Sequence, residues 1–290
     1  MGTVVTVRVA DHGETAEQRD ERAARVAGAM EWFRRTEACC SRFDANSEIR
    51  RLTASVGTPF TASPALFQAV RFAIALAEET NGAFDPMVGH AMAAHGFDRN
   101  YRTGEAVPFG MRGAGTFRDV EIDAANSTIT LHAPIQLDLG AVAKGLAVDL
   151  AARELSALEN FAIDAGGDLY LAGHNERGEA WSVGIRHPRR EGETIETLRG
   201  SNMAVCTSGD YERRNEAGHH ILDPIAGGSA GRAASVTVVA PLAMVADALS
   251  TAAFVLGPWR GLELLARHRV EGLIVTPALD RFATPGLPRG

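Results

Sequence analysis

Strand-like and helix-like stretches follow one another irregularly along this chain, and this order constrains its fold more than any other feature. Residues 3–9 alternate apolar and polar side chains, as a strand does. Residues 15–40 and 64–80 carry apolar side chains at helical spacing, and Pro64 after Ser63 marks the start of the second helix. Because no regular strand–helix–strand alternation is present, we expect an α+β fold with mixed or antiparallel sheets and packed helices.

Further segments of both kinds fill the rest of the chain. Residues 119–132 predict two strands joined by a turn, and residues 160–172 predict a hairpin that turns at Gly166-Gly167. Residues 41–55 and 83–118 lack clear periodicity, and we expect loops there. The other expected elements are strands at 135–139, 181–188, 201–209, 234–241 and 270–275, and helices at 141–157, 243–256 and 258–268.

Length and composition are those of a globular protein. The chain has 290 residues, of which 46% are hydrophobic and 22% charged, enough for a sizeable buried core. No internal repeat or low-complexity linker marks a boundary. We therefore expect residues 1–290 to form a single domain, as one body or as two intertwined lobes.

Charge and cysteine content exclude several classes of protein. The net charge of −7 gives no basic footprint for nucleic acid. Cys39, Cys40 and Cys206 match neither a disulfide framework nor a zinc site, which suits a reducing compartment. The sequence contains no run of 18 apolar residues, so we expect no membrane-spanning helix. The N-terminal segment does not resemble a signal peptide. We expect a cytoplasmic protein.

The segment LDLGAVAKG, residues 137–145, has the features of an anion site. A strand is expected to end at Asp138, Gly140 permits a sharp turn, and a helix follows. The first turn of a helix presents unpaired backbone N–H groups, and Lys144 adds a positive charge nearby. A plain strand–helix corner with a surface lysine explains the same residues equally well.

A second pattern, ADALSTA, places Asp247 and Thr251 four residues apart on one face of a predicted helix. A carboxylate and a hydroxyl are hard oxygen ligands that suit Mg²⁺ or Ca²⁺. The alternative is an aspartate favoured near a helix start and a threonine that bonds back to its own helix.

Two loop segments hold further candidates. In residues 79–89, Phe84 is either a core residue or a stacking surface, and Asp85-Pro86 is typical of a turn. In residues 207–228, His219 and His220 lie near carboxylates, where a histidine is a candidate general base or simply a surface residue. The glycines of residues 165–169 are interpreted as structural, because they permit positive φ.

Read together and in order, these segments resemble the ApbE family of FAD:protein FMN transferases. The resemblance covers nearly the whole chain. The shared motifs are Met1-Gly2-Thr3; Ser41, Phe43, Ser47 and Glu48 of a serine- and aromatic-containing loop; GAFDPMVG at 82–89; DLGAVAKGLAVD at 138–149; TSGDYER at 207–213, followed by His220-Ile221-Leu222-Asp223-Pro224; and ADALSTA at 246–252.

The resemblance implies an ApbE-like, T-fold-like architecture and a set of site residues. The residues implied to hold FAD, the substrate, are Met1, Phe43, Ala83, Phe84, Asp85, Asp138, Lys144 and Ile221. The residues implied to hold Mg²⁺ are Asp247 and Thr251 with a backbone oxygen of Ala141, and Ser250 close by. His220 matches the general base, which accepts a proton from the Ser or Thr hydroxyl of an acceptor protein.

The sequence departs from the family pattern at two places. Met87 replaces a threonine, which removes one hydrogen-bonding group near the expected flavin. Ile225-Ala226-Gly227 replaces the more usual Arg-Thr-Gly after Asp223-Pro224 and changes the contacts of that loop. Two alternative functions remain beside transfer: a metal-dependent FAD pyrophosphatase, and an FAD-binding protein without catalysis.

Overall fold

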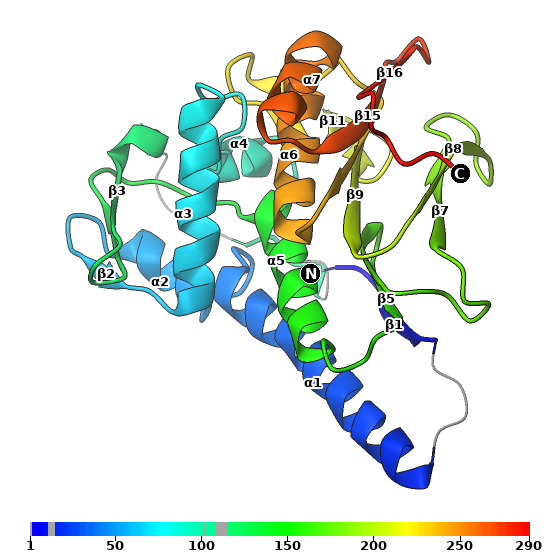
Figure 1. The fold of residues 1–290 in the computed structure, drawn as a ribbon. Helices are drawn as coiled ribbons and strands as arrows, with labels where there is room; N and C mark the ends of the chain where they lie inside the picture. Colours follow the sequence, from blue (N-terminus) through cyan, green and yellow to red (C-terminus); the bar gives the residue numbers. More distant parts are fainter. Residues whose placement is uncertain (1, 11–14, 101–102, 108–114) are drawn as a thin grey trace. The chain divides into compact units, whose positions relative to one another are not determined.

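The computed structural model describes residues 2–10, 15–100, 103–107 and 115–290 (Figure 1). These residues form two compact units. The described residues of Met1–Gly2, Arg35–Ala143 and Glu212–Ala230 make up the first unit. Those of Thr3–Arg34, Lys144–Tyr211 and Gly231–Gly290 make up the second. Each unit therefore combines segments that are distant in sequence.

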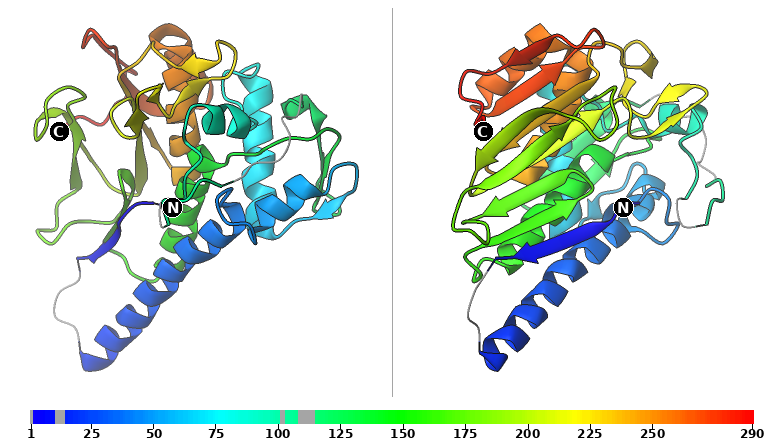
Figure 2. Two further views of the ribbon diagram at one scale, coloured as in Figure 1. Left: turned by 180° about the vertical axis from the view of Figure 1, so that it is seen from behind. Right: turned by 90° about the vertical axis from the view of Figure 1, so that its right-hand side faces the viewer.

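The second unit is built on a seven-stranded sheet whose strand pairs are all antiparallel, seen in the right panel of Figure 2. Its strand order is β1-β5-β6-β9-β14-β15-β16. The bounds are Val5–Val9 for β1, Phe161–Ala165 for β5, Asp168–Ala172 for β6, Met203–Gly209 for β9, Ser235–Ala240 for β14, Glu271–Val275 for β15 and Arg281–Ala283 for β16. The expected α+β class with antiparallel sheets is confirmed.

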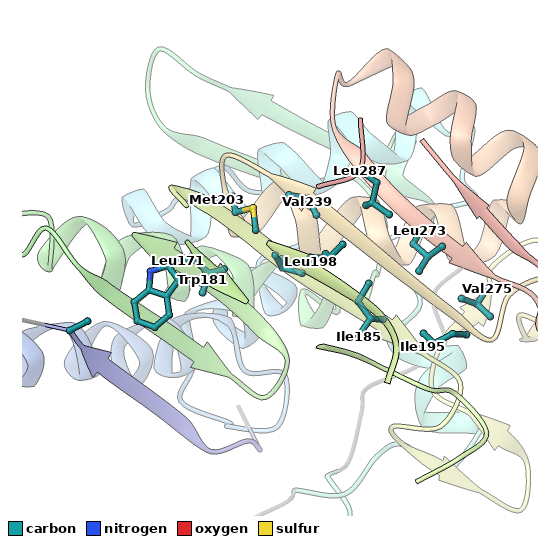
Figure 3. Packing of buried hydrophobic residues seen from close by; sticks show 12 residues of the cluster. Leu171, Trp181, Ile185, Ile195, Leu198, Met203, Val239, Leu273, Val275 and Leu287 are labelled. Carbon is teal, nitrogen blue, oxygen red and sulfur yellow. The ribbon is translucent and has the colours of Figure 1, made fainter. Parts of the chain in front are cut away.

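A two-stranded ribbon packs against one face of this sheet. The ribbon pairs β7 (Trp181–Arg186) with β8 (Thr194–Gly200). Figure 3 shows the apolar cluster between them, in which side chains of the ribbon lie near Met203 of β9. The cluster residues are Ala10, Leu171, Trp181, Ile185, Ile195, Leu198, Met203, Val205, Val239, Leu273, Val275 and Leu287.

Helices cover the opposite face. The helices α6 (Ala243–Leu256) and α7 (Pro258–Arg267) pack on β9, β14 and β15. Successive side chains of β9 point to opposite faces of the sheet. Met203 and Val205 lie in the apolar cluster under the ribbon, whereas the Sγ of Cys206 donates to the carbonyl of Ala243 in α6 at 3.5 Å. Both faces of this strand are buried, which explains its almost continuous apolar sequence.

The helix α5 (Gly140–Glu154) approaches α6 closely at Gly145. A Cβ built on Gly145 would lie 2.4 Å from the carbonyl oxygen of Ala243. The Gly145 amide donates to a carboxylate oxygen of Asp247 at 3.2 Å. Glycine is therefore required here by the close approach of two backbones, which also brings α5 and α6 together at the polar cluster described below.

We predict that Gly145→Ala lowers the free energy of unfolding by about 2 kcal/mol or more, because the added methyl group overlaps backbone that cannot move aside. Gly231→Ala is the matched control, since a Cβ there would meet nothing within 4 Å. Urea unfolding of both variants measures the difference. Equal stability of the two variants would contradict the close approach of α5 and α6.

The first unit contains further helices and smaller sheets. They are α2 (Glu48–Ala54), α3 (Pro64–Glu79), α4 (Gly89–Ala94), the 3₁₀ turn Phe117–Asp119, a sheet of order β2-β4-β3, and two small hairpins. The sheet strands are β2 (Phe60–Thr61), β3 (Val120–Asp123) and β4 (Thr128–Leu131). The hairpins pair β10 (Arg214–Asn215) with β11 (Gly218–His219) and β12 (Leu222–Asp223) with β13 (Gly228–Ser229). The remaining long helix of the chain is α1 (Ala16–Cys40).

Several expectations about individual elements are wrong. Residues 135–139 form no strand, although Ile135, Leu137 and Leu139 are buried, because their alternation reflects side-chain burial without strand pairing. Residues 41–55 contain α2, and residues 83–118 contain α4. The strands β8 and β16 were also not expected.

No helix in the described part of the chain is long and apolar enough to cross a membrane.

Candidate functional site

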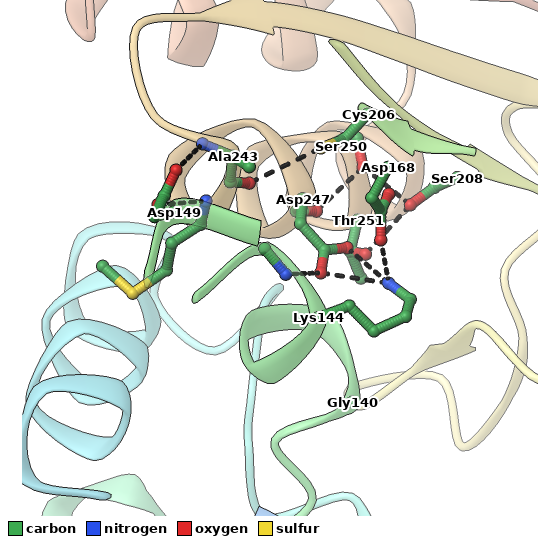
Figure 4. A network of polar contacts seen from close by, with 12 residues as sticks. Gly140, Lys144, Asp149, Asp168, Cys206, Ser208, Ala243, Asp247, Ser250 and Thr251 are labelled. Carbon is green, nitrogen blue, oxygen red and sulfur yellow. Dashed lines mark hydrogen bonds and ion pairs between the residues drawn. The ribbon is translucent and has the colours of Figure 1, made fainter. Parts of the chain in front are cut away.

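A buried polar cluster in the second unit centres on Lys144 (Figure 4). The Lys144 ammonium donates to both carboxylate oxygens of Asp247, at 3.1 and 3.0 Å. It also forms an ion pair with the Oδ2 atom of Asp168 at 2.5 Å. The side chains of both aspartates are only 4% exposed, and that of Lys144 is 28% exposed. One ammonium group is thus held between two buried carboxylates.

The local folds of three elements bring these groups together. Lys144 lies in the early part of α5, and Asp247 lies in the early part of α6. Asp168 is the first residue of β6, directly after the turn formed by Gly166 (φ 70°) and Gly167 (φ 96°). The glycines interpreted as structural therefore also place a charged side chain in the cluster.

Burial and the neighbouring charges shift the pKa values of Lys144 and Asp247. Burial alone would lower the pKa of Lys144, but the charges of Asp168 and Asp247 raise it well above its usual value. Burial and the charge of Asp168 raise the pKa of Asp247 to about 6, against the opposing effect of Lys144. A second cation close to Asp247 would hold that carboxylate in its charged form.

Three hydroxyl groups lie beside the carboxylates. The Oγ atom of Ser208 is 2.8 Å from that of Ser250 and 3.0 Å from Oγ1 of Thr251. Ser250 also donates to the carbonyl of Asp247 at 2.8 Å, a bond back to its own helix of the kind considered as the alternative for Thr251. Lys144, Asp247, Ser250 and Thr251, all predicted from the sequence, are therefore brought together in one unit.

The donor set of this cluster suits a hard divalent cation. A carboxylate and hydroxyl oxygens are typical ligands of Mg²⁺. Among the residues that the structure describes, no group of three His, Cys, Asp or Glu side chains is arranged to hold a metal. A Mg²⁺ site completed by a ligand's own oxygens fits the carboxylate and hydroxyls of this cluster.

The start of α5 differs from the expected anion site. The Gly140 amide donates to the Asp138 carboxylate at 2.7 Å, and the amides of Val142 and Ala143 donate to the carbonyl of Leu139. These N–H groups therefore already have partners. The half-buried Ala141, predicted to supply a backbone oxygen, lies in this first turn.

In the first unit, Asp138 is held by an arginine that the sequence reasoning did not single out. The Nε atom of the buried Arg42 donates to Asp138 at 2.7 Å, and the Nη2 atom donates to the carbonyl of Phe97 at 2.5 Å. The Arg42 guanidinium lies 4.1 Å from the ring centroid of Phe43. Two residues implied in FAD binding, Phe43 and Asp138, thus share one buried cation.

The GAFDPMVG segment forms a compact loop after α3. Ala83 and Phe84 are each 5% exposed, so the Phe84 ring is largely enclosed. The Asp85 carboxylate accepts from the amide of Met87 at 2.8 Å, and burial raises the pKa of Asp85. Because the backbone of Met87 makes this bond, the exchange of threonine for methionine leaves the turn itself intact.

The loop packs against a glutamine whose amide lacks partners. The Gln136 residue is only 6% exposed, and neither its Oε1 nor its Nε2 atom has a hydrogen-bond partner among the described residues. A Cβ on Gly89 would lie 2.6 Å from the Cγ atom of Gln136. A buried amide without partners is costly unless a ligand satisfies it. The site therefore fits a ligand with both donors and acceptors, as the flavin ring has.

The two adjacent histidines have different environments. The Nδ1 atom of the buried His219 accepts from the amide of Ile221 at 3.3 Å, so its Nε2 atom carries the proton and donates to the carbonyl of Ala230 at 2.8 Å. His219 is therefore committed to holding β11 against β13. The half-buried His220 packs edge-on against Phe97, with 6.4 Å between ring centroids. Of these two histidines, His220 remains the candidate for acid–base chemistry.

The altered loop after Asp223 retains a defined turn. The Asp223 Oδ1 atom accepts from the amides of Ile225 and Ala226, both at 3.0 Å. Ile221 is buried beside this hairpin, whereas Ile225 is 75% exposed. The departure from the family pattern therefore alters the surface of the loop and not its backbone support. Met1, also implied in FAD binding, lies outside the described residues.

Sequence reasoning assigned no role to Asp168, Ser208, Arg42 and Gln136. Ser208 lies inside a recognised motif, and Arg42 precedes Phe43 of another, so their positions were available as a signal. Nothing in the local sequence marks Asp168 or Gln136 as a site residue, because their partners come from distant segments.

Comparison with known proteins identifies the family. The model of the ApbE family matches residues 1–274. A Treponema pallidum protein named FAD:protein FMN transferase is 32% identical, over 99% of this chain and 85% of its own length. The protein of that name from Haemophilus influenzae is 28% identical, over 98% and 86%.

Solved structures agree with these relatives. The ApbE protein from Thermotoga maritima superimposes with a TM-score of 0.81 at 29% identity, covering 99% of this chain and 95% of its own. The flavin transferase ApbE from Vibrio cholerae gives 0.79 at 26% identity, covering 98% and 94%. The resemblance inferred from the sequence motifs is thereby confirmed, and the chain belongs to the ApbE family.

Proposed function

We propose that this chain transfers FMN from FAD to a Ser or Thr hydroxyl of an acceptor protein, in a Mg²⁺-dependent reaction that releases AMP. Relatives across nearly the full chain carry the name FAD:protein FMN transferase. The observation that carries the proposal is the cluster of Lys144, Asp247, Ser250 and Thr251, in which one cation and several hard oxygen donors lie together. A pyrophosphate and its Mg²⁺ require this chemistry.

We assign one set of residues to Mg²⁺ and another to FAD. Asp247 and Thr251 hold Mg²⁺, with the backbone oxygen of Ala141 and with Ser250 nearby. Mg²⁺, when bound, neutralises charge on the phosphate oxygens. The residues proposed to hold FAD are Phe43, Ala83, Phe84, Asp85, Asp138, Lys144 and Ile221, together with Met1.

Each residue's task follows from its chemistry. Lys144 supplies a positive charge toward the phosphate groups, and Gln136 offers its amide donor and acceptor to the flavin. His220 accepts the proton of the acceptor hydroxyl. The hydroxyl oxygen forms a bond to the phosphorus of the FMN half, while the bond from this phosphorus to the bridging oxygen breaks. AMP leaves with that oxygen, and FMN remains on the acceptor as a phosphoester.

The proposal predicts that purified chain mixed with FAD, Mg²⁺ and an acceptor domain gives one AMP for each acceptor that gains the mass of FMN. Mass spectrometry of the acceptor and chromatography of AMP measure both products. EDTA should stop both, and excess Mg²⁺ should restore them.

The other outcomes separate the alternatives. AMP release with free FMN and no labelled acceptor would replace the transferase by a pyrophosphatase, in which water attacks. FAD binding without AMP under any condition would leave only a flavin-binding protein.

A further inference from the structure

The chemistry proposed above assigns no task to Asp168, yet this carboxylate makes the shortest contact of the cluster, 2.5 Å from the Lys144 ammonium. Both Asp168 and Asp247 are almost fully buried, whereas a single ammonium group faces them. Lys144 is, moreover, the only lysine of a chain whose lysines and arginines total 29. We therefore ask which property of lysine, absent from arginine, this position would use.

Lys144 and a divalent cation need the same carboxylate. The ammonium contacts both oxygens of Asp247, at 3.1 and 3.0 Å, which are the atoms that a metal would bind. Two cations on one buried carboxylate repel each other strongly, because the surroundings screen them poorly. Metal binding at Asp247 therefore requires that Lys144 give up at least part of this contact.

A second carboxylate allows this exchange without leaving a buried charge unpaired. Asp168 is held at the start of β6, and its backbone lies opposite Cys206 in the neighbouring strand β9. Its backbone position is thus fixed by strand pairing in the sheet. A lysine ammonium is a compact charge on a flexible stem and can move between two oxygens, whereas the arginine fork favours one fixed bidentate partner.

We propose that Asp168 is a positioning residue that keeps Lys144 in the cluster when a divalent cation takes Asp247, so that both positive charges are present together. This inference rests on the metal assignment of the proposed function. It adds that Asp168 acts through Lys144. Without Asp168, Lys144 has only Asp247 as a carboxylate partner in the cluster and competes directly with the metal.

The test measures Mn²⁺ binding to the FAD-free chain by the loss of the free-ion signal in electron paramagnetic resonance. Asp168→Asn should weaken binding by about tenfold or more, and Asp247→Asn should abolish it. In the Lys144→Met background, the loss caused by Asp168→Asn should be smaller by at least about threefold. Asp164→Asn, at an exposed aspartate of the same hairpin, should change nothing.

Three results would overturn the proposal. If Asp168→Asn has no effect, Asp168 plays no part in metal binding. If the effect is equal or larger in the Lys144→Met background, Asp168 acts on the metal by its own charge and not through Lys144. Unaltered binding in Asp247→Asn would place the metal elsewhere.

A second measurement needs no Lys144 variant, in case that substitution prevents folding. Lysine labelled with ¹³C and ¹⁵N reports on this chain through one side-chain signal, since Lys144 is its only lysine. Saturating Mg²⁺ should shift the wild-type signal but keep it sharp, and should broaden or remove it in Asp168→Asn. Loss of the wild-type signal to the same degree would contradict the inference.

Neither measurement uses flavin chemistry, so the two ideas fail separately. A chain that shows the expected coupling but transfers no FMN would refute the proposed function alone. A chain that transfers FMN without this coupling would refute only the role of Asp168.

Discussion

His220→Ala should lower the rate of FMN transfer by about two to four orders of magnitude, while His219→Ala should lower stability instead. The difference follows from their partners. Both ring nitrogens of His219 are used in backbone hydrogen bonds, to Ile221 and Ala230. His220 packs its half-buried ring edge-on against Phe97, and imidazole is the side chain best suited to proton transfer at physiological pH.

The two substitutions act as controls for each other. In His219→Ala, the Ile221 amide and the Ala230 carbonyl lose their partner inside the first unit, which should cost about 2 kcal/mol of unfolding free energy. In His220→Ala, the unfolding midpoint and the affinity for FAD should stay close to those of the wild type. Thermal unfolding, FAD titration and the transfer assay together separate the two effects.

Two results would count against this assignment. If His220→Ala keeps more than about half of the transfer rate, another group accepts the proton, because loss of a general base costs far more. If His219→Ala unfolds at the wild-type midpoint, the bonds of its ring do not support the hairpin.

Regular elements were predictable from local pattern wherever that pattern was long or strongly marked. The helix α6 was predicted at the residues where it occurs, 243–256, and in the structure it ends at Gly257, which has a positive φ. The hairpin of β5 and β6 was predicted from its two glycines. The pairing of β9 with β14 lies beyond local pattern, because strands distant in sequence meet only in the folded sheet.

The failures have local physical causes. The helix α2 spans seven residues, too short for a periodic signal, although Ser47 caps it and Ile49 and Leu52 are buried three residues apart. The segment 135–139 alternates like a strand, but its amide at Asp138 bonds to the carbonyl of Pro86 in the GAFDPMVG loop. Alternation predicts burial on one side of an extended chain, and only tertiary structure decides whether a second strand pairs with it.

The site shows the same division between short-range and long-range information. Asp247 and Thr251 were predictable as neighbours, because residues four positions apart on a helix lie on the same face. Lys144 pairs with Asp168 and Asp247, and Thr251 contacts Ser208. The partners Asp168, Asp247 and Ser208 each lie on a different element. The sequence motifs predicted only part of this set. Asp168 was missed because the glycines before it already accounted for the segment as a structural turn.

The second large effect is expected from Arg42→Met, which should lower the unfolding free energy by about 3 to 5 kcal/mol at pH 7. The guanidinium of Arg42 is buried and bonds to Asp138 at 2.7 Å and to the Phe97 carbonyl at 2.5 Å. Methionine fills a similar volume but leaves the Asp138 carboxylate without its main counter-charge.

The loss should depend on pH in a defined direction. Burial alone would raise the pKa of Asp138, but Arg42, the Gly140 amide and the charge of Arg213 together lower it. The wild type therefore gains stability from this group at neutral pH and loses it as pH falls through the lowered pKa. In Arg42→Met burial dominates, so Asp138 takes up a proton more readily, and the deficit should shrink as pH falls from 7 toward about 4.

Urea unfolding at pH 7, 5.5 and 4 measures this narrowing, with Arg34→Met as the control. Arg34 pairs with Glu31 on the surface, where the side chains are 70% and 44% exposed, and such pairs contribute about 1 kcal/mol or less at any pH. A deficit in Arg42→Met that stays constant from pH 7 to pH 4 would mean that lost packing, and not the uncompensated charge of Asp138, destabilises the variant. The proposed site then gains a further test, because an Asp138 that has lost its hydrogen bond and counter-charge from Arg42 should also bind FAD more weakly at neutral pH than it does in the wild type.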